Sequence, residues 1–385
     1  MIDSTETQLF KSKVSVLTIP RENFWIFQAG ILEIIFRLVD LYENRTNSRY
    51  SDNDSASISS KSDRSAFDES FSDYDNTYEG YSGPKSPSAS FDNEDTQSLG
   101  EIVENEIEDD GFFFHLAFTT EEVTLICSTR LIRKHLSKAI KLDKESTLIS
   151  DEFFIIQVFS DGLNIGKKIL ELTEPLSLNN ISLFFISNYF SDLVLVPIKD
   201  KVKALEILKK VESEDNVNLY GEELEHKTFE LFKNNDIKPK LVTDVRLVLT
   251  GARSGDFIAV LKQTAESIAR LNTESISGKN AFPEYFAITR TPTEEIGLLL
   301  PYETIELNKL RFSRSNIMGS LQDYYYPIFV DLKKLPLDLK GIVAGMASKL
   351  LRMGIDEMSY LSLGRSGIVL IPDTFKEKVQ EKLEL

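Results

Sequence analysis

The sequence is short of the residues on which disulfide frameworks and metal sites depend. It has one cysteine in 385 residues, Cys127, so no disulfide can form within the chain. This cysteine lies in an apolar run, TLICSTRLI, which favours an inert core position over a nucleophile. The three histidines, His115, His135 and His226, lack the spacing of metal ligands. We therefore expect no disulfide, no metal site and no other cofactor.

Long apolar runs and catalytic motifs are lacking too. Charged residues interrupt every apolar stretch well before the ~20 residues that cross a bilayer, so we expect no membrane insertion. MIDSTETQLF at the start has no basic segment followed by an apolar one, which argues against a secretory signal and, with the single cysteine, for a cytoplasmic protein. No G-x-S-x-G, H-E-x-x-H or dinucleotide glycine pattern occurs. The sequence predicts a protein that is not an enzyme.

Negative charge is concentrated in one segment. Residues 44–110 hold 17 acidic and 5 basic residues, a net charge of −12 out of −17 for the whole chain. Serine and acidic residues dominate this segment, and its apolar residues are too few to offset the entropy of ordering, so we predict a disordered insertion. Such a charge repels nucleic acid and anionic lipid, and we expect neither as a partner.

The rest of the chain alternates strand-like and helix-like segments in one recurring order, β-α-β-β-α. This order is typical of a split βαβ, or ferredoxin-like, sandwich of the α+β class. It predicts about four tandem units, the first interrupted by the insertion. Their ranges are 12–43 with 111–146 for unit 1, 150–222 for unit 2, 241–312 for unit 3 and 322–385 for unit 4, with a linker at 223–240.

Within the units, the predicted strands and helices follow the apolar runs. The predicted strands are 14–20, 112–118, 123–129, 153–159, 181–187, 193–197, 245–251, 285–290, 296–301, 325–332, 355–362 and 367–372. The predicted helices are 23–43, 133–142, 165–178, 199–211, 256–271, 341–354 and 374–383.

Units 2 and 4 repeat one another. Their hairpins align without gaps at a separation of 174 residues, which puts Asp192 on Ser366, and Gly166 and Gly341 open the corresponding helices. One sandwich of about 65 residues is marginally stable alone, so we expect the units to pair. A helix that opens on glycine offers unpaired N–H groups to a carboxylate, and clefts between domains commonly bind ligands. These features predict a site for a free amino acid.

Several stretches carry a resemblance to a known family. They are NNISLFFISNYFSDLVLVP in unit 2, DIKPKLV at 236–242, GIVAGMASKLLRMGI and GIVLIP in unit 4, and FFFHLAFTTEEVTLI in unit 1. The repeated units resemble ACT domains, and the chain outside the insertion resembles the CASTOR family of cytosolic arginine sensors, which have four such units. The resemblance implies a ligand between units 2 and 4, a homodimer, and a protein partner, the GATOR assembly upstream of the target-of-rapamycin kinase complex, that ligand binding releases.

The resemblance also implies particular site residues. Ser182 and Leu183 match positions that hold the amino-acid end of the ligand, Gly341 and Ile342 match the helix opening of unit 4, and Ser362 matches a neighbouring threonine. Tyr189, Phe190 and Asp192 at the hairpin tip match positions that hold the partner. Strand-end and turn chemistry alone also explains Ser182 and Asp192. Uncovered sheet edges in units 1 and 3 favour self-association as well.

Three positions depart from the family, and one of them bears directly on the ligand. Ser366 stands where the family has an aspartate that recognises the guanidinium of arginine. Leu363 stands where the family has an aromatic residue, and Pro336 where it has a glycine. Without a carboxylate a buried guanidinium loses charge-assisted bonds, so the ligand is arginine held by Asp338, Asp356 or Glu357, another amino acid, or none. Three hypotheses follow: an amino-acid-responsive regulator, a scaffold that has lost its pocket, and the regulatory part of a biosynthetic enzyme. The last is weakest, because the four units leave no room for a catalytic domain.

Overall fold

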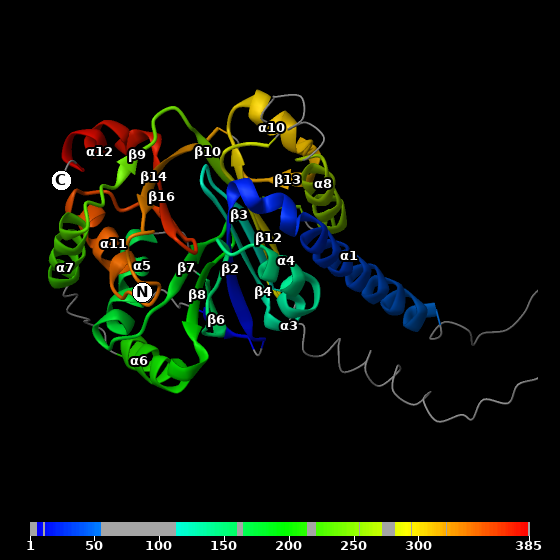
Figure 1. Cartoon of the computed structure of the whole chain (residues 1–385), viewed down its shortest axis with the longest axis horizontal. Coiled ribbons are helices and arrows are strands. Elements are labelled where there is room, and N and C mark those ends of the chain that lie inside the picture. Colours follow the sequence, from blue (N-terminus) through cyan, green and yellow to red (C-terminus); the bar gives the residue numbers. More distant parts are fainter. Residues whose placement is uncertain are drawn as a thin grey trace, which may run out of the picture. The chain divides into compact units, whose positions relative to one another are not determined.

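The computed structural model describes residues 6–10, 12–54, 113–159, 165–213, 221–253, 255–271, 282–293, 295–320 and 322–383. The chain has two compact bodies: residues 1–42 with 109–385 form the larger one, and residues 43–108 form the smaller one. In the smaller body the described part is the end of helix α1, which runs from Phe24 to Asp54. The fold described below is that of the larger body (Figure 1).

The described strands form one antiparallel network. The bounds of the strands are Glu6–Leu9 (β1), Val14–Pro20 (β2), Phe114–Phe118 (β3), Glu122–Ser128 (β4), Thr147–Leu148 (β5), Phe153–Phe159 (β6), Phe184–Ser187 (β7), Asp192–Pro197 (β8), Lys240–Leu241 (β9), Leu247–Ala252 (β10), Phe286–Arg290 (β11), Ile296–Pro301 (β12), Ile317–Met318 (β13), Tyr325–Asp331 (β14), Ser359–Ser362 (β15) and Ser366–Pro372 (β16).

Helices flank this network in two groups, one on each side of the strands in Figure 1. The first group is α1, α3 (Thr129–Leu131), α4 (Ser137–Leu142), α8 (Phe257–Ala269) and α10 (Thr304–Leu310). The second group is α5 (Ile165–Leu178), α6 (Lys201–Ser213), α7 (Gly221–Asn234), α11 (Ile342–Arg352) and α12 (Lys376–Lys382). A π-helical turn, Ile132–Leu136, separates α3 from α4, so the helix predicted at 133–142 is interrupted. No helix in the described residues is long and apolar enough to cross a membrane.

One strand order recurs four times in the described residues. In their order across the sheet, the four groups are β3-β4-β2-β5, β7-β8-β6-β1, β11-β12-β10-β13 and β15-β16-β14-β9. In each group the short last strand pairs with the strand written just before it. The last strands β1 and β9 come from outside the repeats they join: β1 precedes β2 in the chain, and β9 follows α7. These two exchanges were not predicted, because strands of two to four residues leave little apolar pattern to detect.

The four groups join edge to edge in a closed ring. β3 pairs with β11 over five residue pairs, and β7 pairs with β15 at Ile186 and Leu361. Single contacts from β14 to β10 and from β2 to β6 complete a ring of twelve described strands. The inner hairpin edges of units 1 and 3 are therefore covered within the chain, and the uncovered edges expected to favour self-association are absent there.

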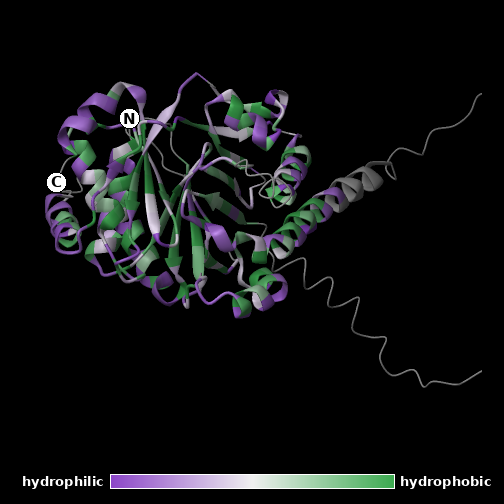
Figure 2. Cartoon of the chain, turned by 45° about the horizontal axis from the view of Figure 1, so that its top comes forward, coloured by the Kyte–Doolittle hydropathy of each residue, from purple (hydrophilic) through white to green (hydrophobic). Residues whose placement is uncertain are grey.

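Long apolar strands form because both of their faces are buried. On β2, Leu17 and Ile19 pack under the first helix group, whereas Val14 and Val16 face inward against β6. Such strands read as nearly continuous apolar runs. Figure 2 shows the result, with hydrophobic strands inside and hydrophilic residues mainly on the helices.

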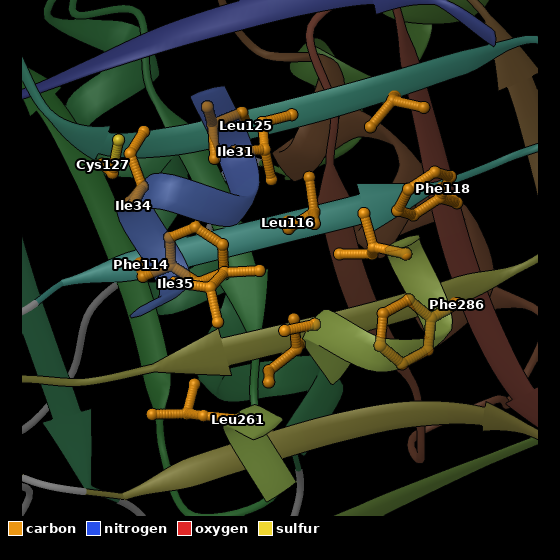
Figure 3. Close-up of a cluster of buried hydrophobic side chains, with 14 of the residues drawn as sticks. Ile31, Ile34, Ile35, Phe114, Leu116, Phe118, Leu125, Cys127, Leu261 and Phe286 are labelled. Atoms are coloured by element: carbon orange, nitrogen blue, oxygen red, sulfur yellow. The ribbon is translucent and has the colours of Figure 1, made fainter. Parts of the chain in front are cut away.

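Under the first helix group, side chains from distant parts of the chain interdigitate in one core. Ile31, Ile34 and Ile35 of α1 pack on alternate residues of β3 and β4, and Leu261 of α8 extends the cluster (Figure 3). Cys127 is fully buried in this core, as its apolar context predicted.

The predicted insertion and the predicted linker also differ from the structure. Helix α1 continues to Asp54, eleven residues into the insertion predicted at 44–110, because a helix already nucleated extends at little cost. The rest of that insertion, 55–110, lies outside the described residues. The predicted linker at 223–240 contains most of α7, whose buried residues Leu224, Thr228 and Phe232 recur every four positions. This single buried stripe lies in an otherwise polar sequence.

Candidate functional site

A cavity of about 70 Å³ lies between units 2 and 4, where the chain enters β7 and where α11 begins. Five of the seven predicted ligand-binding residues line it: Leu183, Gly341, Ile342, Ser362 and Ser366. Pro336 and Leu363, which depart from the family pattern, line it as well. Ser182 is half-buried beside the cavity without lining it. We call this site the open cleft.

The opening of α11 leaves backbone N–H groups without a side-chain cap. Gly341 precedes the helix with φ of 87°, a left-handed conformation that glycine adopts without strain, and no side chain caps the helix start. Helix α7 holds this turn in place, because the Thr228 hydroxyl donates a hydrogen bond to the Gly341 carbonyl at 3.2 Å. The helix therefore presents a fixed, positively polarised end to the open cleft.

Serine hydroxyls connect the two hairpins behind the cleft. The Phe185 N–H donates to Ser362 Oγ at 2.9 Å, and the Tyr360 N–H donates to Ser187 Oγ at 3.0 Å. These two bonds are related by a two-fold symmetry that places Ser187 on Ser362. Among the described residues Ser362 Oγ has no hydrogen-bond acceptor, so its hydroxyl proton is available to a ligand in the cleft.

The same symmetry corrects the predicted alignment of the hairpins. The turn bond from Asn188 N–H to the Ser191 carbonyl matches that from Leu363 N–H to the Ser366 carbonyl. The hairpins therefore correspond at a separation of 175 residues, and Ser366 corresponds to Ser191 instead of Asp192. One extra residue between Ile355 and Ser362 accounts for the difference, and apolar pattern alone did not locate it.

A second cleft, related by this symmetry, is closed. The N–H of Gly166, at the opening of α5, donates to the Asp356 carbonyl at 2.9 Å. Met358 and Leu351 cover Gly166 so closely that an added Cβ would lie 2.7 Å from Met358 Cε and 3.2 Å from Leu351 Cδ2. In the open cleft Leu183 stands at the position of Met358, and among the described residues no hydrogen bond joins the α11 opening to Ile181 or Ser182. We call the Gly166 site the closed cleft.

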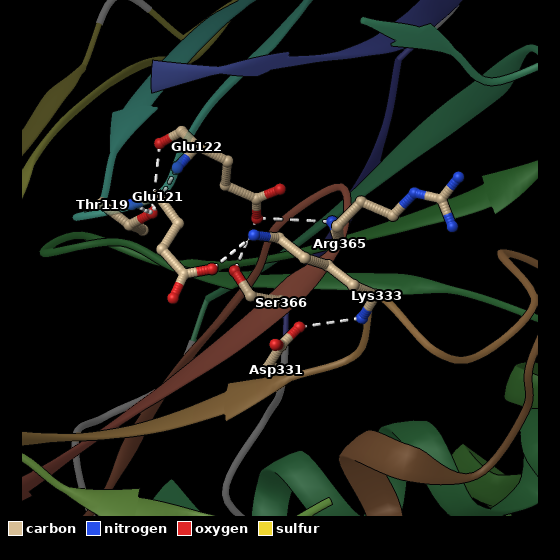
Figure 4. A network of polar contacts seen from close by, with 7 residues as sticks. All are labelled: Thr119, Glu121, Glu122, Asp331, Lys333, Arg365 and Ser366. Carbon is tan, nitrogen blue, oxygen red and sulfur yellow. Dashed lines mark hydrogen bonds and ion pairs between the residues drawn. The ribbon is translucent and has the colours of Figure 1, made fainter. Parts of the chain in front are cut away.

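Behind Ser366, the open cleft borders on unit 1 through a carboxylate that the sequence did not single out. The Ser366 hydroxyl donates to Glu122 Oε1 at 2.5 Å, and the Arg365 N–H donates to the same oxygen at 3.3 Å (Figure 4). Burial raises the pKa of Glu122, although these two bonds act in the opposite direction. Lys333 forms an ion pair with the neighbouring Glu121.

The carboxylates predicted to replace the missing aspartate lie outside the cavity wall. Asp338 is exposed and interacts with the exposed Lys199, and it is the second predicted ligand-binding residue that does not line the cavity. Asp356 and Glu357 are also exposed, on the chain that enters β15 beside the closed cleft. The structure therefore does not bring these three carboxylates together with the other site residues.

The predicted partner-binding tip lies against unit 3. Phe190 is half-buried over Gly251, and Tyr189 packs on Gly319 with 37% of its surface exposed. Asp192 is buried, which raises its pKa to about 6, and it bonds with Ser187. Of the three predicted partner-binding residues, only Tyr189 is exposed, and their role in partner binding stays a prediction.

Within the described part of the chain, no group of three or more His, Cys, Asp and Glu side chains is arranged to hold a metal ion. The polar groups at the open cleft are hydroxyls and backbone groups. They suit a small zwitterion, whose carboxylate accepts hydrogen bonds from N–H groups and whose ammonium donates to carbonyls.

Comparison with known proteins identifies one part of the chain. Residues 148–210, from β5 to α6, match the ACT domain. This part of the chain is therefore similar in sequence to ACT domains. The match supports the α+β, ACT-type fold predicted for unit 2.

No curated protein matches the chain. Among solved structures, aspartate kinase from Synechocystis is similar at 9% sequence identity and a TM-score of 0.25, over 70% of this chain. The chain spans about half, 48%, of that protein's length.

Proposed function

We propose that the protein is a non-catalytic regulator that binds a free amino acid in the open cleft. ACT domains generally bind amino acids in regulatory roles, and residues 148–210 match one. We also infer that the four repeated strand groups are four tandem ACT-like units, because each has the same strand order. The carrying observation is the uncapped opening of α11 beside a cavity. Among the described residues no hydrogen bond from this opening reaches the strand entry at Ile181 and Ser182.

At two other sites in the chain, an N–H group donates a hydrogen bond to a backbone carbonyl at the entry of a strand. At the closed cleft the carbonyl of Asp356 accepts the Gly166 N–H. Between units 1 and 3, the Arg21 guanidinium donates at 2.8 Å to the carbonyl of Pro283 and to that of Glu284, just before β11. In both places an N–H donor bridges a helix opening and a strand entry. In the open cleft we assign this role to the ammonium group of the ligand, and we place its carboxylate at the α11 opening.

The proposal is tested by thermal unfolding of the full chain with each of the twenty amino acids at millimolar concentration. A ligand at ~100 times its Kd stabilises the folded state by about 2.7 kcal/mol, which raises the Tm of a chain of this size by a few degrees. Leu183→Met copies the residue of the closed cleft and is expected to abolish the shift. Val202→Met adds the same side chain at a 71% exposed site on α6 and should leave the shift unchanged.

A ligand-independent scaffold is the second candidate, and the cavity volume favours it. About 70 Å³ is far below the ~300–1,000 Å³ of pockets for drug-sized ligands. If no amino acid raises the Tm, the scaffold replaces the regulator as the better hypothesis.

For the output of the regulator, we propose the release of a protein partner, as the resemblance to the CASTOR sensors implies. The proposed partner is an assembly resembling GATOR, in nutrient signalling to the target-of-rapamycin kinase complex, and Tyr189 is the exposed tip residue available for contact. Binding of the purified assembly, measured with and without amino acid, tests this output. The homodimer is a further proposal, and sedimentation velocity measures it.

A further inference from the structure

The described residues that line the open cleft include no charged side chain. The polar side chains on it are the hydroxyls of Ser177, Ser362 and Ser366 and the phenol of Tyr360, which burial keeps neutral by raising its pKa. The other side chains are apolar, and four leucines of the segment before α11 lie among them: Leu332, Leu335, Leu337 and Leu339. We propose that the bound amino acid has an uncharged, apolar side chain. This inference rests on the proposed function.

The buried carboxylate that is hydrogen-bonded to a residue of the cavity wall does not itself line the cavity. Glu122 stands behind Ser366 and is absent from the cavity wall. Its Oε1 already accepts two hydrogen bonds, from the Ser366 hydroxyl and the Arg365 N–H, while its buried Oε2 has no hydrogen-bond partner among the described residues. Its burial also favours the neutral acid over the carboxylate. A cation that entered the cleft would therefore lose its hydration shell without meeting a charged side chain on the described cavity wall.

The closed cleft supplies an independent observation on the kind of group that fits. There the chain fills the space at the helix opening with its own side chains, the thioether of Met358 and the isobutyl group of Leu351. Both are uncharged and apolar. Because Leu183 replaces Met358 in the open cleft, the space that Met358 occupies in one cleft is available to a ligand in the other. The small cavity favours a short, unbranched side chain such as that of norvaline.

Isothermal titration calorimetry of the full chain with size-matched pairs tests the inference. One pair is norvaline and 2,4-diaminobutyrate, and the other is norleucine and ornithine; in each pair a terminal methyl replaces an ammonium. We expect the apolar member of each pair to bind at least tenfold more tightly. Equal or tighter binding of the charged members overturns the inference and leaves the proposed function intact. Binding of no amino acid at all overturns both.

A variant of the cleft wall provides a second test. Leu337 is half-buried in the segment before α11, and Leu337→Glu places a carboxylate in the wall. We expect it to weaken norvaline at least tenfold and to reduce the preference over 2,4-diaminobutyrate, whereas Leu337→Met should preserve both. An unchanged preference in a Leu337→Glu protein of normal Tm contradicts selection by the apolar wall.

Discussion

The open and closed clefts are two copies of one arrangement with different outcomes. Each places a helix that opens on glycine, Gly341 or Gly166, against the entry of the paired unit's hairpin strand. In the closed cleft, a backbone hydrogen bond and the side chain of Met358 complete the contact. In the open cleft no such bond forms among the described residues, and the shorter Leu183 leaves a cavity. Under the function proposed above, the closed copy contributes stability and the open copy binds the ligand.

The chain length before each helix also differs between the two clefts. Ten residues, 332–341, separate β14 from α11, whereas five, 160–164, separate β6 from α5. The longer segment supplies the leucines of the open cleft wall. The shorter one lies outside the described residues.

Truncation of Met358 should have the largest effect on this comparison. Met358→Ala removes a fully packed side chain from the closed cleft and is expected to lower the free energy of unfolding by about 2–5 kcal/mol. Leu183→Ala, at the corresponding position of the open cleft, should cost less than half as much, because Leu183 is only half-buried. Urea denaturation of both variants measures the difference. Equal losses would show that the two clefts are packed alike.

The pH dependence of stability should differ between the two hairpins. Burial of Asp192, on the unit 2 hairpin, raises its pKa from an ordinary value of 3.8 to about 6, whereas its counterpart, 175 residues further along the chain, is Gly367. Between these pH values the folded state binds more protons than the unfolded state. The contribution of Asp192 to the free energy of unfolding is therefore full below pH 3.8 and is lost as the pH rises through 6. The loss is at most about 1.4 kcal/mol per pH unit.

The comparison of wild type with Asp192→Asn, by urea denaturation between pH 4 and 7, isolates this contribution. Buried His115, with a pKa of about 3, is present in both proteins and acts with the opposite sign. The stability of wild type relative to the variant should fall across this range. A constant difference would mean that Asp192 titrates normally.

The smallest expected effect concerns the two glycines. Gly166→Ala should cost about 1 kcal/mol, because the added methyl contacts Met358, and Met358→Ala in the same chain should remove that cost. Gly341→Ala should cost ~1–2 kcal/mol from its left-handed backbone and be unaffected by Met358→Ala. A double-mutant cycle measures the coupling. Coupling at Gly341 as strong as that at Gly166 would contradict the distinction between the clefts.

Much of the fold could be predicted because its strands are buried on both faces. The predicted bounds of β2, β6, β12 and α5 are those of the structure. The strands predicted at 181–187 and 355–362 begin only at Phe184 and Ser359, because their first residues form the cleft entries and pair with no strand. Apolar pattern alone does not distinguish a paired residue from an unpaired one that is equally buried.

The sequence by itself determined the repeated order of strands and helices, the glycines that open α5 and α11, and the residue types around the cleft, because periodicity and backbone preference are local properties. Only the tertiary structure decided which cleft stays open, that Glu122 of unit 1 supports Ser366 of unit 4, and that β1 and β9 complete other repeats. These outcomes depend on contacts between residues far apart in the chain. They also depend on the difference in length between the side chains of Leu183 and Met358, which has a consequence only once the two units are paired.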